Sequence, residues 1–119
     1  MIARLPAGLL RLEGLAVLMG ALVLYFDSGF GWLLLLLLVL APDLSMLGYL
    51  AGPAVGAASY DAVHTYAVPT ALAVAGVLGE SDTAVQIALI WFAHIGVDRF
   101  LGYGLKYPSS FKDTHLQRV

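Results

Sequence analysis

The stretch "TAVQIALIWFAHIGVDRFL", residues 83–101, joins an apolar run typical of a membrane helix to three ionisable side chains. These side chains, His94, Asp98 and Arg99, fall within six positions. Ionisable residues are costly in the hydrocarbon core of a bilayer, where they face the protein interior, pair with one another or mark a functional site. The stretch therefore predicts a transmembrane helix with a polar site on one face.

The composition of the chain agrees with a membrane location. Of its 119 residues, 61% are hydrophobic and 12% are charged, whereas soluble domains have about 45–50% apolar and about 25% charged residues. The net charge of −2 offers no basic surface, so we expect no nucleic-acid partner. The absence of cysteine excludes disulfides and thiolate metal ligands. We predict a single integral membrane domain over residues 1–119.

Four apolar segments reach the length of about 20 residues that a spanning helix needs. They cover residues 6–26, 31–50, 53–78 and 83–105, and a polar tail follows at 106–119. Lys and Arg gather near the two ends of the chain, while the first and third connections carry only acidic residues. Because basic residues concentrate on the cytoplasmic side, both termini are predicted to be cytoplasmic. The sequence thus predicts an all-α fold, a four-helix transmembrane bundle.

Each predicted span carries ionisable residues at a similar depth. At 1.5 Å per residue they lie about 10–16 Å from the cytoplasmic end. These residues are Glu13, Asp43, Asp61, His64, His94 and Asp98. Spacings of four from His94 to Asp98 and three from Asp61 to His64 place each pair on one helix face. We predict one polar layer inside the bundle, beside helix kinks caused by prolines 42 and 69.

The charges of this layer favour a divalent metal ion. Four carboxylates against the two arginines at positions 11 and 99 leave two negative charges beside two imidazoles. Mixed His and carboxylate ligands suit such a cation, although protonated carboxylates or hydration of the outermost groups are alternatives. The predicted metal ligands are His64, His94, Asp98 and Asp43. The predicted catalytic residues are Asp43, as a base or fourth ligand, and Asp61, and the predicted head-group ligands are Arg99 and Lys106.

Three motifs carry a family resemblance: "APDLSMLGYLAGPAVG" at 41–56, "HTYAVP" at 64–69 and "HIGVDRFLGYGLKYPSSFKDTHL" at 94–116. With them the chain resembles, over nearly its whole length, a family of small four-span bacterial integral membrane proteins labelled a domain of unknown function. The resemblance implies a multi-pass protein of the bacterial inner membrane and implies no activity.

The chain also has a looser similarity to membrane-bound metal-dependent hydrolases. Those proteins carry an Asp after Pro, a His before Thr or Ser, and His-x-x-x-Asp on three helices. The corresponding residues here are Pro42-Asp43, His64-Thr65 and His94 with Asp98, while Ser45 stands where that pattern has a second Asp. The similarity implies metal-dependent hydrolysis, and the membrane location adds a lipid-like substrate.

Three other functions are compatible with the same residues. Intramembrane carboxylates and prolines suit a carrier of protons, metal ions or small solutes. His64 and His94 could hold one haem axially. A structural role in membrane assembly would use the polar layer to hold helices together. The small extramembrane surface leads us to expect a homo-oligomer in contact with membrane lipid.

Overall fold

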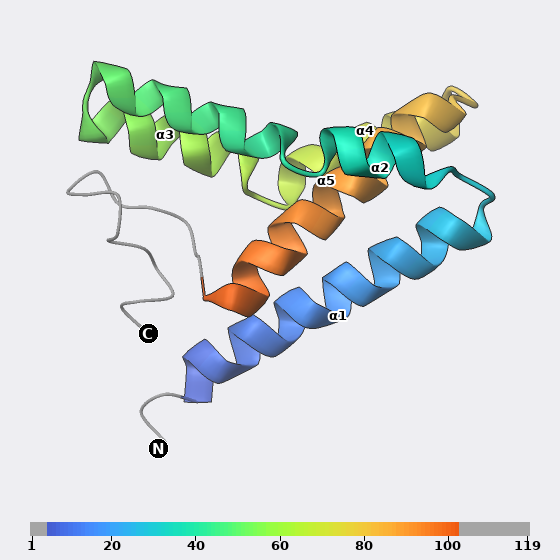
Figure 1. The fold of residues 1–119 in the computed structure, drawn as a ribbon, viewed down its shortest axis with the longest axis horizontal. Coiled ribbons are helices and arrows are strands. Elements are labelled where there is room, and N and C mark those ends of the chain that lie inside the picture. Colours follow the sequence, from blue (N-terminus) through green and yellow to red (C-terminus); the bar gives the residue numbers. More distant parts are fainter. Residues whose placement is uncertain (1–4, 103–119) are drawn as a thin grey trace.

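The computed structural model describes residues 5–102 of the protein, and helices dominate this part of the chain (Figure 1). No strand occurs between residues 5 and 102. The helices, in chain order, are α1 (Leu5–Asp27), α2 (Trp32–Leu38), the 3₁₀ helix η2 (Ala41–Ala51), α3 (Pro53–Val63), α4 (Ala67–Leu78) and α5 (Asp82–Leu101).

These helices form four segments that are long and apolar enough to cross a membrane: α1, α2 with η2, α3 with α4, and α5. Large apolar side chains lie on their outer surfaces, as on Leu50, which is 89% exposed. Such a surface fits hydrocarbon rather than water. The predicted all-α class and its four spans are confirmed, whereas the cytoplasmic location of the termini stays a prediction.

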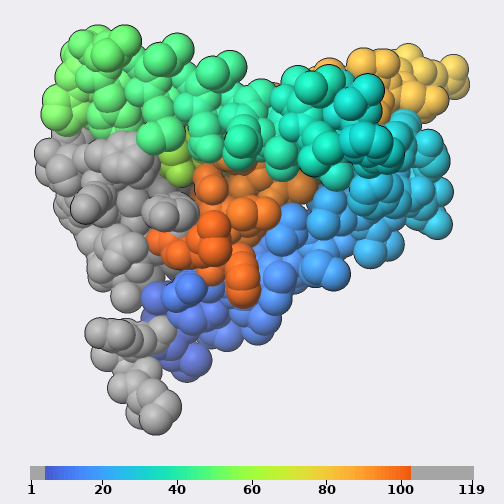
Figure 2. All heavy atoms as spheres, in the orientation of Figure 1, coloured from blue at the N-terminus to red at the C-terminus, as the bar shows by residue number. Residues whose placement is uncertain are grey.

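Helix α5 lies at the centre of the fold. It packs along α1 on one side and along α4 on another, while η2 pairs with α3. Figure 1 shows η2 and α3 as a layer that diverges from α1, with α5 running between the two. The space-filling view shows the same order, with the orange atoms of α5 between the blue and green surfaces (Figure 2). Side chains of α5 therefore reach all the other spans.

Glycines set the close packing of α1 on α5. A Cβ atom on Gly14 would overlap the Arg99 side chain, and a Cβ atom on Gly96 would overlap the backbone of Leu18. Small residues allow helix backbones to approach closely in membranes, where there is no hydrophobic drive for helices to associate. This contact fixes the position of α5 along the axis of α1, and hence the position of the polar residues on α5.

Two of the predicted continuous spans are broken in the middle. The span predicted at 31–50 changes from α-helix to 3₁₀ helix around Val39 and Leu40, just before Pro42. The span predicted at 53–78 is interrupted between Val63 and Ala67, just before Pro69. Proline lacks an N–H group, and its ring clashes with the carbonyl four residues earlier, so an α-helix does not continue smoothly through it. Each kink expected at a proline is thus a full interruption.

The ends of α5 follow from its capping residues. The Ser81 hydroxyl accepts a hydrogen bond from the Ala84 amide at 3.2 Å and caps the N-terminus of the helix. At the other end Gly102 is left-handed, with φ of 100°. Glycine adopts this conformation without steric cost and ends helices. The helix therefore stops at Leu101 rather than at the predicted residue 105, which lies outside the described residues.

Candidate metal centre

Four side chains from three spans converge at the two helix interruptions. Asp43 comes from the first turn of η2, His64 follows α3 at its C-cap, and His94 and Asp98 come from one face of α5. Each offers one ligand atom, and these four atoms all lie within 4.8 Å of one another. The sequence-based prediction that these four side chains meet is confirmed.

The ligand atoms are close enough to share one ion. The Nε2 atoms of His64 and His94 are 3.0 Å apart. Asp43 Oδ1 lies 3.4 Å from the first and 3.1 Å from the second, and Asp98 Oδ2 lies 3.3 Å from both. A tetrahedral ion about 2.0–2.1 Å from its ligands requires ligand atoms about 3.3–3.4 Å apart. Neighbouring octahedral ligands at about 2.1 Å lie about 3.0 Å apart. The five distances span these values.

The outer nitrogens of both imidazoles are bound to backbone carbonyls. His64 Nδ1 lies 2.9 Å from the Tyr60 carbonyl oxygen, and His94 Nδ1 lies 2.5 Å from that of Val39. A carbonyl oxygen only accepts, so each Nδ1 carries the hydrogen and donates it. In the neutral ring the Nε2 atom then has a free lone pair. This second contact is the one that metal-binding histidines usually make.

These carbonyls lie near the two helix interruptions. Val39 is the C-cap of α2, where the chain break leaves its carbonyl available, and the Tyr60 carbonyl, in the last turn of α3, accepts from the His64 amide as well as from the imidazole. Two more acceptors at the α3–α4 break are satisfied by α5. Trp91 Nε1 donates to the Val63 carbonyl at 2.6 Å, and Arg99 donates to the His64 carbonyl at 3.1 Å. Irregular backbone is tolerated at membrane depth where the protein satisfies it in this way.

The site is buried on one side and open at Asp43. The side chains of His64 and His94 are only 3% and 4% exposed, and that of Asp98 is 17% exposed, whereas that of Asp43 is 39% exposed. Solvent or a ligand therefore reaches the cluster most readily past Asp43.

Tyr60 is a member of the site that sequence reasoning missed. Its ring stacks on the His64 imidazole with centroids 3.7 Å apart and an angle of 7°. Its hydroxyl donates to Asp98 Oδ2 at 3.3 Å. The signal was present in the sequence, since Tyr60 precedes His64 by four residues, a spacing that brings side chains together near a helix end.

Other predicted site residues lie elsewhere. Asp61 is on α3, partly buried, and is not a member of the four-residue group. The side of α3 that faces the cluster is that of Tyr60, and the predicted catalytic role of Asp61 stays a prediction. Arg99 is buried, with its guanidinium inside the protein rather than at the surface, where a lipid head group would meet it. Lys106 lies outside the described residues.

An axial haem between the two histidines does not fit. Two ligands on opposite faces of one iron lie about 4 Å apart with the porphyrin plane between them. The Nε2 atoms of His64 and His94 are 3.0 Å apart, and the carboxylates of Asp43 and Asp98 flank the gap. We therefore discard the haem hypothesis.

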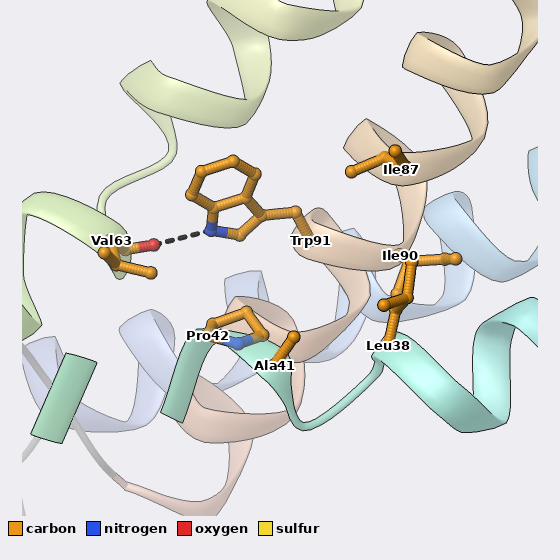
Figure 3. A pocket seen from close by; sticks show the side chains of 7 residues that line it. All are labelled: Leu38, Ala41, Pro42, Val63, Ile87, Ile90 and Trp91. Carbon is orange, nitrogen blue, oxygen red and sulfur yellow. Dashed lines mark hydrogen bonds between the residues drawn. The ribbon is translucent and has the colours of Figure 1, made fainter. Parts of the chain in front are cut away.

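An apolar cavity of about 230 Å³ borders the cluster (Figure 3). Its lining consists of Leu38, Ala41, Pro42, Val63, Ile87, Ile90 and Trp91. Three of these residues are next in sequence to Val39, Asp43 or His64, so the cavity begins where the polar site ends. Its one polar side-chain atom, the Trp91 indole nitrogen, is bound to the Val63 carbonyl. The cavity is therefore suited to hydrocarbon.

The fold and this cluster define a multi-pass helical membrane protein with a buried His/Asp group that could bind a metal ion. The chain belongs to the family described as Domain of unknown function (DUF4260), whose model matches residues 7–119. No curated protein and no solved structure shows a significant match to it. The family resemblance seen in the sequence is thus confirmed, whereas the similarity to metal-dependent hydrolases is not shown.

Proposed function

We propose that the protein binds a divalent metal ion within the membrane through Asp43, His64, His94 and Asp98. One observation carries the proposal: both Nδ1 atoms donate to carbonyls, so two Nε2 lone pairs face each other at 3.0 Å. Lone pairs repel at this distance unless a cation or a proton lies between them. Two carboxylate oxygens surround the same point.

A metal ion compensates this arrangement more completely than a proton. One proton shared by the two Nε2 atoms leaves a net charge of −1 with the two carboxylates. A divalent ion brings the charge of the group to zero and binds all four atoms. Uncompensated charge is costly at membrane depth, and the separations between the ligand atoms suit an ion at about 2.0–2.1 Å from each.

The ligand types narrow the choice of ion. Two imidazoles with two carboxylates, and no thiolate, suit zinc, iron(II), cobalt or manganese rather than copper(I). Co²⁺ is a useful probe because its visible spectrum reports on the ligand geometry. A closed tetrahedral site and an octahedral site with open positions give different Co²⁺ spectra.

A finer proposal is metal-dependent hydrolysis of a lipid-like substrate. It is supported by the partial exposure of Asp43 at 39%, the largest among the four ligands, and by the apolar cavity beside it. In this role a bound metal ion would lower the pKa of water toward about 7, and Asp43 would serve as the base or as a fourth ligand. The other three ligands stay bound.

A carrier of cations is the second candidate, and the two interrupted spans favour it. Membrane carriers often bind their ions where discontinuous helices expose backbone groups at the middle of the bilayer. Here the α2–η2 and α3–α4 interruptions both meet at the cluster. Uptake of ⁵⁷Co²⁺ into proteoliposomes tests this role directly.

The test of metal binding is a Co²⁺ titration of chelator-treated protein in lipid nanodiscs. We expect one equivalent bound by the wild type and none by His94→Ala, because that variant loses a ligand to which both carboxylates are paired. Asp61→Asn is the matched control, since it removes a carboxylate from the same span as His64 but outside the cluster. Wild-type protein that binds no Co²⁺ or Zn²⁺ refutes the proposal.

A further inference from the structure

Two side chains of α5 hold consecutive carbonyls of the α3–α4 interruption. Trp91 Nε1 donates to the Val63 oxygen at 2.6 Å, a bond drawn in Figure 3, and Arg99 donates to the His64 oxygen at 3.1 Å. Trp91 and Arg99 lie on either side of His94 along α5, three residues before it and five residues after it. We call Trp91 and Arg99 the carbonyl clamp.

The clamp acts on the part of the chain that presents His64. His64 is neither in α3 nor in α4, and its own backbone has φ of −103° and ψ of 15°. Its amide remains bound to the Tyr60 carbonyl at 2.9 Å, so the α3 side of the residue is fixed. The carbonyl side has left the helix, and Arg99 is the donor that the structure supplies to it.

The buried position of Arg99 supports a structural use of its charge. The residue is 8% exposed, and its guanidinium carbon lies 5.7 Å from the centroid of the Tyr66 ring, within cation–π range. Tyr66 is the last residue before α4. Arg99 therefore contacts both the residue that begins the interruption and the one that ends it.

We propose that Trp91 and Arg99 are positioning residues for the metal centre, a proposal that rests on the metal-binding function. They fix the peptide groups on either side of the His64 α-carbon, and this holds the imidazole toward His94. A guanidinium and an indole suit the task because each donates to a carbonyl from a rigid planar group. Neither touches the ion.

The proposal predicts a loss of metal affinity without loss of a ligand. Arg99→Gln shortens the side chain and withdraws the guanidinium from the His64 carbonyl, and Trp91→Phe removes the indole N–H. Loss of groups that orient metal ligands typically costs 10–100-fold in affinity, and we expect a loss of about tenfold for Co²⁺ with each variant, because the clamp acts through the backbone. The visible spectrum of the remaining bound Co²⁺ should shift.

Matched controls separate positioning from general destabilisation. Arg11→Gln removes another arginine bond to a backbone carbonyl, from Arg11 Nε to Phe100 at 2.9 Å, away from the cluster. Trp32→Phe changes a tryptophan that is 63% exposed. Both should bind Co²⁺ as the wild type does. Arg99→Lys, which keeps a charged donor, should recover part of the lost affinity.

A second measurement uses protein without metal. Amide hydrogen exchange at residues 65–68 should be faster in Arg99→Gln and Trp91→Phe than in the wild type and the two controls. If the wild type binds Co²⁺ and the clamp variants match their controls in affinity and spectrum, the clamp is refuted and metal binding stands. If the wild type binds no metal, the metal proposal fails, and exchange that is unchanged in the clamp variants overturns the clamp as well.

Discussion

The Nε2 atoms of His64 and His94 lie 3.0 Å apart, with each ring held from behind by a backbone carbonyl. The two residues come from different spans; the Val39 carbonyl lies at the α2–η2 interruption, and the Tyr60 carbonyl lies in the last turn of α3, just before the α3–α4 interruption. Broken helices thus contribute acceptors as well as side chains to the centre. The central helix α5 supplies His94 and Asp98 to the centre, and Trp91 and Arg99 to the carbonyls of the α3–α4 interruption.

Metal should stabilise the folded protein. A ligand that binds only the native state adds about 2.7 kcal/mol when its concentration is one hundred times its dissociation constant. We expect Zn²⁺ to raise the Tm of the wild type in detergent and to leave that of Asp98→Asn little changed. An equal Zn²⁺ effect on both proteins would show that the ion acts elsewhere.

The hydroxyl of Tyr60 should tune the centre without being essential to it. Tyr60→Phe removes the bond to Asp98, which is 3.3 Å long, but keeps the ring stacked on His64. We expect a loss of Co²⁺ affinity of about tenfold or less, near the low end for groups that orient metal ligands. Tyr60→Ala also removes the stacking and should cost more.

Tyr25 offers a control for this experiment. Its hydroxyl donates to the Gly31 carbonyl at 2.5 Å and accepts from Gln86 at 2.9 Å, in a buried position outside the metal cluster. Tyr25→Phe should lower stability and leave Co²⁺ affinity unchanged. If Tyr60→Phe binds Co²⁺ with the same affinity as the wild type, the Tyr60 hydroxyl has no role in the metal centre.

Much of the fold could be predicted because hydropathy and helix caps act locally. Twenty-residue apolar segments give the four spans, and Ser81 marks the start of α5. The pairing of His94 with Asp98 also follows from helical spacing. The contact between His64 and His94 was predictable from their similar depth in the membrane, since ionisable side chains inside a bilayer usually pair with one another.

The parts that could not be predicted depend on where helices stop. The proline rule located the interruptions approximately but predicted kinks rather than breaks. Helical spacing makes both Tyr60 and Asp61 neighbours of His64, and it does not tell which of them faces α5; in the structure Tyr60 does. The buried role of Arg99 was also missed, because the carbonyl it binds is released only by that interruption.

The contact of α1 with α5 should be intolerant of added volume. Gly14→Ala places a methyl group against Arg99 and Gly96, and overpacking of this kind costs about 1–3 kcal/mol. Gly20→Ala is the control on the same helix, because nothing lies within 4 Å of its added methyl group. It should be neutral or stabilising by up to about 1 kcal/mol.

Thermal unfolding in detergent measures both variants. Since Arg99 belongs to the carbonyl clamp, Gly14→Ala should also weaken Co²⁺ binding, whereas Gly20→Ala should not. A Gly14→Ala protein as stable as Gly20→Ala would contradict the close packing of α1 on α5.

The orientation of the protein is the last prediction. Lys and Arg cluster near the chain ends and are missing from the first and third connections, so the positive-inside rule places both termini in the cytoplasm. The protein has no cysteine, which leaves no background in a labelling experiment. We expect a membrane-impermeant thiol reagent to label Ser28→Cys, in the exposed first connection, in intact cells. Ser110→Cys, in the C-terminal segment, should react only after the membrane is permeabilised. The reverse labelling pattern would contradict this orientation. Asp43, the exposed side of the centre, would then lie nearer the outer face of the membrane instead of the cytoplasmic face.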